Sequence, residues 1–529
     1  MKTITGPLLA ALLVAALPQA ARAVDDPPEV RAVWVDAFHA GIRSPAETAE
    51  LVAAAKRAHL NTLIVQVRRR GDALYLKGVE PPVDDPAYDP AFDALAHVID
   101  AAHAAGLEVH AWVNAMPVWR GDTPPSDPRH VFNRHGPTAA GDENWFTASP
   151  TGEHRFPVGY FLDPGHPAAA AYLVGIYLDL VRHYAVDGIH FDYIRYPETD
   201  ERLPRGAGVG YNAVSLARFR RATGRTDTPA PADGQWMAWR RTQVTQLVRR
   251  VAVEARAIRP NIKVSAALIP WGQAPKGEKD FAEVAPMQRI YQDWHGWLHE
   301  GLIDLAVPMN YAAETDDRVR GWFDDWIRWE KRHGHGRQVA VGLGAYRNAP
   351  ADTLAQIARV RRGDGKHTVS GVSFFSYAVP RRPPEVQANV EPPSALDPSA
   401  TGSERLAFLA DGVNGVAAPF AHPAPVPRMP WIDRPERGWI AGVATGPDPT
   451  PADGATVKIK RAGFSLFART RTLQADGNGY FAFTNVKPGR YRGWVERDGQ
   501  AITRTEVCVA AGQVTHAFTA EDGTTCGGR

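Results

Sequence analysis

Short apolar runs rich in β-branched residues alternate with longer amphipathic stretches over most of the chain. The apolar runs cover residues 30–38, 61–68, 108–116, 188–196, 263–270, 303–311, 338–346 and 369–378. Between them, residues 45–59, 91–106, 167–184, 235–259, 291–300, 320–333 and 352–361 have the apolar spacing of amphipathic helices. This alternation predicts an α/β fold: a (β/α)8 TIM barrel over residues 27–412, with enlarged loops after several strands.

A Pro-rich segment and a second domain are predicted to follow the barrel. Six prolines lie between residues 417 and 435, so residues 413–437 are predicted to form a stiff linker. In residues 438–529, short alternating runs at 439–443, 455–460, 480–483, 491–495 and 503–509 are separated by turns rich in Gly and Asn. This pattern predicts a small all-β sandwich with an accessory role.

Polar and aromatic side chains recur at every second position toward the ends of five predicted strands. They are Trp34 and Asp36, Gln66 and Arg68, His110, Trp112 and Asn114, His190 and Asp192, and Asn310. The strands of a parallel barrel are buried on both faces, and their carboxyl ends meet at one rim. Polar groups arriving there from several strands therefore predict a ligand site.

Asp192 is the first candidate for a catalytic carboxylate, because it stands toward the end of a buried strand. An ion pair that ties this strand to its loop is the structural alternative. Asp36 is a second carboxylate of the same rim, or a cap on the loop that follows it. Glu198 and Glu314 lie on loops that could bring a carboxyl over the site, and the sequence does not choose among these three.

Two carboxylates beside aromatic side chains suit the cleavage of glycosidic bonds. One carboxyl protonates the leaving oxygen, while the other attacks the anomeric carbon or activates water. Aromatic faces position the sugar rings. The residues predicted to bind the substrate are Trp34, Gln66, Arg68, His110, Trp112, Asn114, His190, Tyr193, Arg195, Trp271, Asn310, Tyr311 and Tyr377.

Other chemistries lack their motifs in this sequence. No Gly-rich phosphate fingerprint follows the first predicted strand, so no nucleotide cofactor is expected. A Gly-x-Ser-x-Gly elbow for acyl transfer is also missing. No metal is predicted, because the sequence lacks a His-Glu-x-x-His motif around its candidate histidines. These are His103, His110, His130, His135, His154 and His190.

Composition and charge narrow the function further. Sixty Lys and Arg against 58 Asp and Glu leave a net charge of +2, which disfavours binding to nucleic acid or an anionic membrane. The first 23 residues combine Lys2, a short apolar run and a small-x-small cleavage site, which predicts a signal peptide and a periplasmic or secreted protein without a membrane span. The two cysteines, Cys508 and Cys526, leave room for one disulfide.

Four motifs resemble the bacterial glycosyl hydrolase-like family 10, which is distinct from the family 10 xylanases. They are RAVWV at 31–35, QVR at 66–68 with GDA at 71–73, HAWVN at 110–114, and DGIHFDYIRYP at 187–197. The resemblance implies a TIM barrel related to α-galactosidase-like and α-amylase-like enzymes, with Asp192 as the nucleophile. Many members carry a second Asp directly after it, where this chain has Tyr193.

The family resemblance implies action on a bacterial envelope polysaccharide, including peptidoglycan glycan strands that lack stem peptides. Residues 454–457, 476–481 and 487–491 resemble a carboxypeptidase-regulatory-like domain, which implies a transthyretin-like sandwich. We therefore expect a glycoside hydrolase. The alternatives are a carbohydrate-binding protein without turnover and a hydrolase of an exopolysaccharide or an α-glucan.

Overall fold

The computed structural model describes residues 26–199, 208–379, 402–445, 450–463, 469–497 and 500–518. The predicted signal peptide, at residues 1–23, and Cys526 lie outside these residues. Among the described helices, none combines the length and the apolar composition that a membrane span requires.

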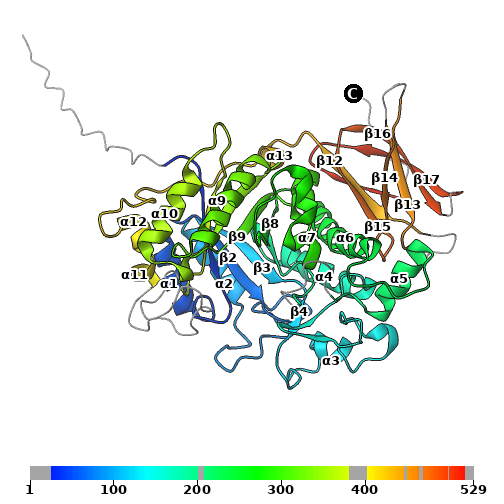
Figure 1. The fold of residues 1–529 in the computed structure, drawn as a ribbon, viewed down its shortest axis with the longest axis horizontal. Helices are drawn as coiled ribbons and strands as arrows, with labels where there is room; N and C mark the ends of the chain where they lie inside the picture. Colours follow the sequence, from blue (N-terminus) through cyan, green and yellow to red (C-terminus); the bar gives the residue numbers. More distant parts are fainter. Residues whose placement is uncertain are drawn as a thin grey trace, which may run out of the picture.

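Eight parallel strands form a closed barrel (Figure 1), which confirms the predicted TIM barrel. Their order around the barrel is β1-β11-β10-β9-β8-β7-β3-β2. The strands are β1 (Val30–Val35), β2 (Thr62–Arg68), β3 (Glu108–Asn114), β7 (Gly188–Asp192), β8 (Lys263–Leu268), β9 (Leu305–Asn310), β10 (Gln338–Gly344) and β11 (Gly371–Phe375). Each lies within one of the eight predicted apolar runs, because a strand buried on both faces is a continuous apolar segment.

Helices follow the strands on the outside of the barrel. The main ones are α1 (Pro45–Arg57), α2 (Ala94–Ala104), α4 (Pro167–His183), α6 (Gly234–Ile258), α8 (Trp294–Glu300), α9 (Asp317–Arg332) and α10 (Pro350–Arg361), with the short α11 (Gly402–Leu406) and α12 (Phe408–Asp411) after β11. Local capping fixes several starts: the side chains of Ser44, Asp93 and Asp233 each accept a hydrogen bond from a backbone N–H of the first turn.

Long segments follow several strands at their carboxyl ends. After β3, the strands β4 (Pro117–Trp119), β6 (Gly159–Phe161) and β5 (Arg155–Phe156) form a small sheet in that order, and α3 (Val131–His135) and η1 (Gly141–Glu143) accompany it. The segment after β7 holds α5 (Ala213–Thr223), that after β8 holds η2 (Glu278–Glu283) and α7 (Ala285–Arg289), and η3 (Ala345–Arg347) follows β10. In Figure 1, α3 and β4 lie at the bottom, so the carboxyl ends of the strands face downward there.

The opposite end of the barrel is closed by residues 417–433, which we call the strap. The segment predicted as a linker thus packs on the barrel, and its short helix α13 (Pro430–Asp433) lies at the top of Figure 1. Met429 is 3% exposed and packs inside the barrel at the amino ends of its strands, among Val30, Ala32 and Leu305. The Trp431 indole donates a hydrogen bond to Asp304 over 2.8 Å.

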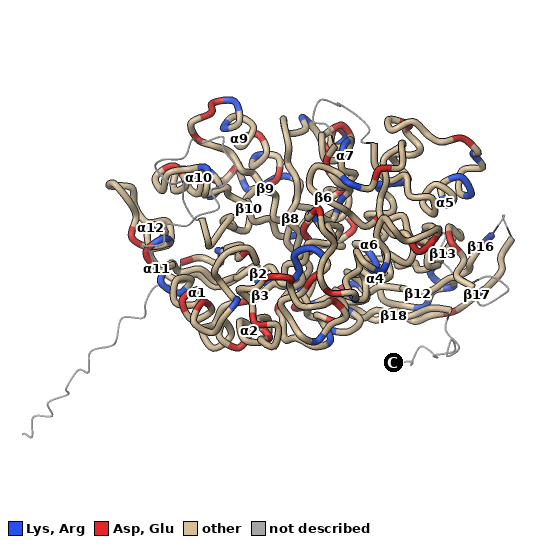
Figure 2. Tube along the Cα trace, turned by 90° about the horizontal axis from the view of Figure 1, so that it is seen from below, with Lys and Arg blue, Asp and Glu red and all other residues tan. Residues whose placement is uncertain are grey.

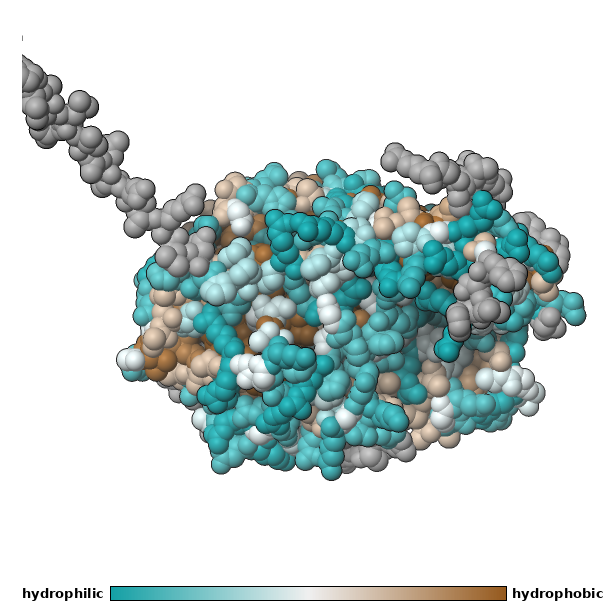
Figure 3. All heavy atoms as spheres, turned by 90° about the horizontal axis from the view of Figure 1, so that it is seen from above, coloured by the Kyte–Doolittle hydropathy of each residue, from teal (hydrophilic) through white to brown (hydrophobic). Residues whose placement is uncertain are grey.

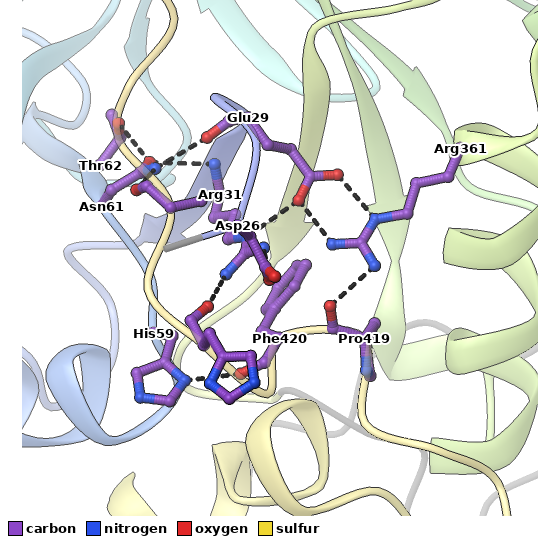
Figure 4. A network of polar contacts seen from close by, with 11 residues as sticks. Asp26, Glu29, Arg31, His59, Asn61, Thr62, Arg361, Pro419 and Phe420 are labelled. Atoms are coloured by element: carbon purple, nitrogen blue, oxygen red, sulfur yellow. Dashed lines mark hydrogen bonds and ion pairs between the residues drawn. The ribbon is translucent and has the colours of Figure 1, made fainter. Parts of the chain in front are cut away.

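Polar contacts fix the strap to β1 and its neighbours (Figure 4). The buried Arg31 guanidinium donates to Asp26, to Glu29 and to the His422 carbonyl, and lies 4.3 Å from the centre of the Phe420 ring. The Asn61 amide donates to the Ala424 carbonyl over 3.0 Å. Proline has no backbone N–H, so the strap has few donors for its own carbonyl groups. The side chains of Arg31 and Asn61 supply donors instead.

Two sheets follow the strap and share one apolar core. One has the order β15-β12-β18 and the other β14-β13-β16-β17. Their strands are β12 (Gly438–Val443), β13 (Thr456–Arg461), β14 (Arg471–Gln474), β15 (Tyr480–Val486), β16 (Gly489–Arg497), β17 (Gln500–Val509), which contains Cys508, and β18 (Val514–Ala517). The all-β C-terminal region predicted from the sequence is therefore present.

The sandwich lies beside α5 and α6, at the right of Figure 1. Asp453 forms ion pairs with Arg218 and Arg221 of α5, at 2.8 and 2.7 Å. The Tyr480 hydroxyl donates to Glu254 of α6 over 2.9 Å. Lys and Arg are interspersed with Asp and Glu along the chain (Figure 2), and the face seen from above is mostly hydrophilic (Figure 3).

Candidate active site

A cavity of about 890 Å³ opens at the carboxyl ends of the barrel strands. Its walls come from the strand ends and from the loops after β1, β2, β3, β7, β8, β9, β10 and β11, together with α9. Ten of the residues predicted from the sequence line it: Asp36, Gln66, Trp112, Asn114, Asp192, Tyr193, Arg195, Trp271, Asn310 and Tyr311. The structure thus brings two of the four predicted carboxylates, Asp36 and Asp192, to one cavity.

Asp192 is the last residue of β7, and its carboxylate is held at both oxygens. One oxygen accepts the backbone N–H of Tyr193 over 2.7 Å, and the other accepts the indole N–H of Trp112 over 3.1 Å. Tyr193 has a φ of 47°, a left-handed conformation that ends the strand and turns its N–H back toward the carboxylate. Burial raises the pKa of Asp192 to about 6, against the opposing effects of these hydrogen bonds and of Arg195.

Asp36 follows β1 and is paired with a histidine that the sequence analysis did not select. One carboxylate oxygen lies 2.7 Å from Nδ1 of His39 and accepts the backbone N–H of Phe38 over 3.0 Å. The hydrogen bond to Asp36 raises the pKa of His39, so this imidazole holds a proton more firmly than a free one. Gln66 accepts the Ala37 N–H over 2.9 Å and fixes the turn. Asp36 and His39 therefore form a proton-carrying pair at the cavity wall.

Asn310, at the end of β9, is oriented by a buried carboxyl that the sequence analysis missed. Its amide lies 3.0 Å from each carboxyl oxygen of Glu330, a residue of α9 that is only 2% exposed. Burial raises the pKa of Glu330 to about 8. The available sequence signal was a Glu four positions after the buried Trp326 of the same helix, because that spacing places Glu330 on the same face as Trp326.

Aromatic side chains cover the cavity walls. Trp112 and Tyr311 lie near the strand ends, Trp271 follows β8, and Trp322 and Trp326 come from α9. The Trp271 ring is flanked by guanidinium groups, with Arg195 at 5.5 Å and Arg289 at 5.8 Å from its centre. These faces suit the stacking of pyranose rings.

The cavity is rich in positive charge. Arg70, Arg120, Arg195 and Arg347 line it, and Arg195 is paired with Glu198 at 2.9 Å. Among the described residues, the other three make no ion pair with a carboxylate within 4.0 Å. Burial and the neighbouring Arg69 lower the pKa of Arg70, as is expected where cationic groups crowd. Against two lining carboxylates, this arrangement favours an anionic ligand.

Three residues predicted to bind the substrate lie beneath the cavity instead. The Trp34 indole donates to Nε2 of His190 over 3.1 Å, and His190 and His110 each place Nδ1 within 2.9 Å of the Ser265 hydroxyl. All four side chains are at most 1% exposed. They form a buried polar layer that supports the floor, because they precede the rim residues by two or four positions on their strands.

Four further predicted residues are also absent from the cavity lining. Arg68 and Glu80 form a fully buried ion pair at 2.8 Å that anchors the loop after β2. Glu314 pairs with Arg359 of α10, and Glu198 is bound to Arg195, so neither carboxylate lines the cavity. Tyr377 packs in the apolar core beside Gly41. Glu198 and Glu314 are thus not supported as catalytic carboxylates by their placement.

Comparisons with known proteins point to one family. A family model described as glycosyl hydrolase-like 10 matches residues 29–344. "Glycosyl hydrolase YngK" of Bacillus subtilis is 24% identical over 457 residues, which cover 80% of this chain and 78% of the relative. "Glycosyl hydrolase DigH" of Escherichia coli is 27% identical over 298 residues, which cover 51% of this chain and 60% of the relative. The solved glycoside hydrolase domain of PgaB (BpsB) from Bordetella bronchiseptica is similar at a TM-score of 0.49 and 16% identity, over 66% of this chain and 94% of that domain.

Proposed function

Because this chain belongs to the glycosyl hydrolase-like 10 family, we propose that it hydrolyses glycosidic bonds of a bacterial envelope polysaccharide. The observation that carries the proposal is the pair of strand-end carboxylates, Asp192 and Asp36, in one aromatic cavity. Two carboxyl groups flanking the scissile bond are the common requirement of retaining and inverting glycosidases.

Asp192 acts as the nucleophile or as the base that activates water. With a pKa raised to about 6, it is ionised at neutral pH and is more basic than an exposed Asp. The donors from Trp112 and Tyr193 hold the carboxylate in one orientation, which lowers the entropy cost of attack. The Asp36–His39 pair supplies the proton to the leaving oxygen.

The positive charge of the cavity supports an acidic glycan as the substrate. In peptidoglycan, the stem peptide is joined by an amide to the lactyl carboxyl of each muramic acid residue. Removing the peptide frees that carboxylate, so a stripped glycan strand carries a negative charge on every second sugar. Arg70, Arg120 and Arg347 are placed to meet such charges, which favours stripped strands over intact peptidoglycan.

The setting of this activity follows from the predicted signal peptide. We place the enzyme in the periplasm or outside the cell, where the envelope polymer lies. The sandwich, in the role that its resemblance implies, orients the barrel on the polymer.

The test measures reducing ends released from purified peptidoglycan, with and without its stem peptides, by the full chain. We expect release from stripped strands, and a loss of at least about 1,000-fold in Asp192→Asn. Glu314→Gln is the matched control, because this carboxylate follows the end of β9 but does not line the cavity, and the amide oxygen can still accept the hydrogen bond from Gln356.

Equal release by the wild type and Asp192→Asn would contradict the role of Asp192. Binding of stripped strands without any release would favour the second candidate, a carbohydrate-binding protein without turnover. That candidate has one observation behind it: Asp36 is already engaged by His39 and the Phe38 N–H. Release from a neutral α-glucan but not from peptidoglycan would contradict the acidic substrate.

A further inference from the structure

A cluster of histidines and one glutamate lies outside the cavity, behind its aromatic wall. Glu278 belongs to η2, His295 to α8, and His335 to the turn after α9. The potential ligand atoms of these three side chains all lie within 4.8 Å of one another. Among the described residues, no other group of three His, Cys, Asp or Glu side chains meets that spacing. Three separate segments thus contribute one potential ligand atom each.

The three atoms are spaced as ligands of one small cation. Nε2 of His295 and Nε2 of His335 are 2.7 Å apart, and Oε1 of Glu278 lies 3.7 and 3.8 Å from them. A point equidistant from the three atoms lies about 2.0 Å from each, and zinc binds imidazole nitrogen and carboxylate oxygen at roughly 2.0–2.2 Å. The spacing of the three atoms is therefore compatible with zinc-bond lengths.

The surroundings hold the two imidazoles in place. The His295 ring packs against both Phe281 and Trp329, with ring centres 5.1 and 5.3 Å away. His335 has a φ of 49°, a left-handed turn that directs its ring toward His295. His299 stands one helical turn after His295, and its ring centre lies 5.1 Å from that of His335. Solvent reaches the cluster, because the Glu278 side chain is 56% exposed.

We propose that Glu278, His295 and His335 bind a divalent cation of the zinc class. Two neutral imidazoles and one carboxylate are ligands that such ions prefer, whereas calcium and magnesium need mainly oxygen ligands. The alternative is a plain hydrogen bond between two imidazoles beside a surface carboxylate. That alternative does not account for a third ligand-type atom, from a separate segment, within 4 Å of both ring nitrogens.

The bound ion links three segments that position a wall of the cavity. The loop that begins at Trp271 runs into η2, while α9 carries Trp322 and Trp326. Trp326 donates to the Gly272 carbonyl over 2.9 Å, and its ring lies 5.9 Å from that of Trp329. The cation therefore holds the segments that carry this aromatic wall, and the wall separates it from Asp36 and Asp192.

The test is a titration of the full chain, without a polyhistidine tag, with ZnCl2 by calorimetry and with Co²⁺ by absorption. We expect one ion per chain, the visible bands of a Co²⁺ site with nitrogen and oxygen ligands, and a rise in the melting temperature with zinc. His295→Asn and His335→Asn should weaken binding by at least about 100-fold, and Glu278→Gln by about 10-fold. Asn tolerates the left-handed backbone at position 335.

His103→Asn serves as the control, because this histidine is half exposed and pairs with Asp187 on another part of the barrel. It should bind zinc as the wild type does. Either of two results would overturn the proposal: no stoichiometric binding by the wild type, or equal affinity in the three ligand variants. Neither measurement uses the glycosidase assay, so the metal site and the proposed function fail independently.

Discussion

Replacing Asp192 by Asn should stabilise the protein while it removes activity, and the gain should depend on pH. Folding raises the pKa of Asp192 from 3.8 to about 6, because the carboxylate loses water on burial. The folded state therefore holds the proton more tightly than the unfolded state. The ionised group costs stability, and that cost develops as the pH rises from about 4 to about 6 and is constant above.

The size of the effect follows from the shift. Two pKa units at 1.36 kcal/mol each give a cost of about 3 kcal/mol at pH 8, which falls to about 0.6 kcal/mol at pH 4. Asn carries no charge, so Asp192→Asn escapes this cost. Its amide can accept from only one of the two donors, Trp112 and Tyr193, and that loss is the same at every pH.

The assay is urea unfolding of the wild type and Asp192→Asn at several pH values, followed by tryptophan fluorescence. The difference in unfolding free energy should move in favour of Asn by about 2 kcal/mol between pH 4 and pH 8. Other buried acids, such as Glu330, titrate in both proteins and cancel. A difference that is flat with pH would refute the reasoning, since it would mean that Asp192 keeps an ordinary pKa in the folded state.

The remaining predictions concern the cavity and the strap. The value of kcat/KM on stripped glycan should rise with pH through about 6, because Asp192 acts ionised; a fall through the same pH, absent from Asp192→Asn, would make it the acid instead. Arg70→Gln and Arg347→Gln should raise KM for the acidic glycan by about 10-fold and lessen its salt dependence, with little change in kcat. Glu330→Gln should remove a decline in stability that develops between about pH 4.5 and pH 8 and is constant above, because the unfolded state releases this proton in that range while the folded state keeps it; urea unfolding of both proteins across this range checks it. Arg31→Ala should lower the unfolding free energy by about 3 kcal/mol, measured by urea titration, because it leaves the strap carbonyl of His422 without its donor and removes the buried guanidinium that pairs with Asp26.

The barrel could be predicted from the sequence because its strands are buried on both sides and leave long apolar runs. The sheet of β4, β5 and β6 could not, since strands of two or three residues show no periodicity. The strap shows a different limit. Its prolines predict an extended chain, but composition does not say what an extended chain packs against, and Met429 and Trp431 are the residues that bind it to the barrel.

The sequence predicts which side chains of the candidate site face the barrel interior, but not how far along the barrel axis each of them lies. Alternation correctly turns Trp34 and Asp36 inward together, yet only Asp36 reaches the cavity, and Trp34 stays in the layer below. The layer that a residue occupies depends on where its strand begins along the barrel axis, and that position is set by pairing between segments distant in the sequence. The positions of the loop carboxylates could not be predicted for a related reason. Glu314 is held by a hydrogen bond from Arg359, which lies 45 residues away in the sequence.

The strap also bears on how such proteins are assembled from parts in evolution. The first and last strands of the barrel, β1 and β11, are neighbours, and the strap crosses beneath this seam from beyond the last strand. A recombination event that joined a new domain directly after the barrel helices would discard Phe420 and Met429 and uncover the apolar end of the barrel. The exchangeable unit therefore extends through residue 433, and a different C-terminal domain can be inherited at low cost only when it is grafted after that position.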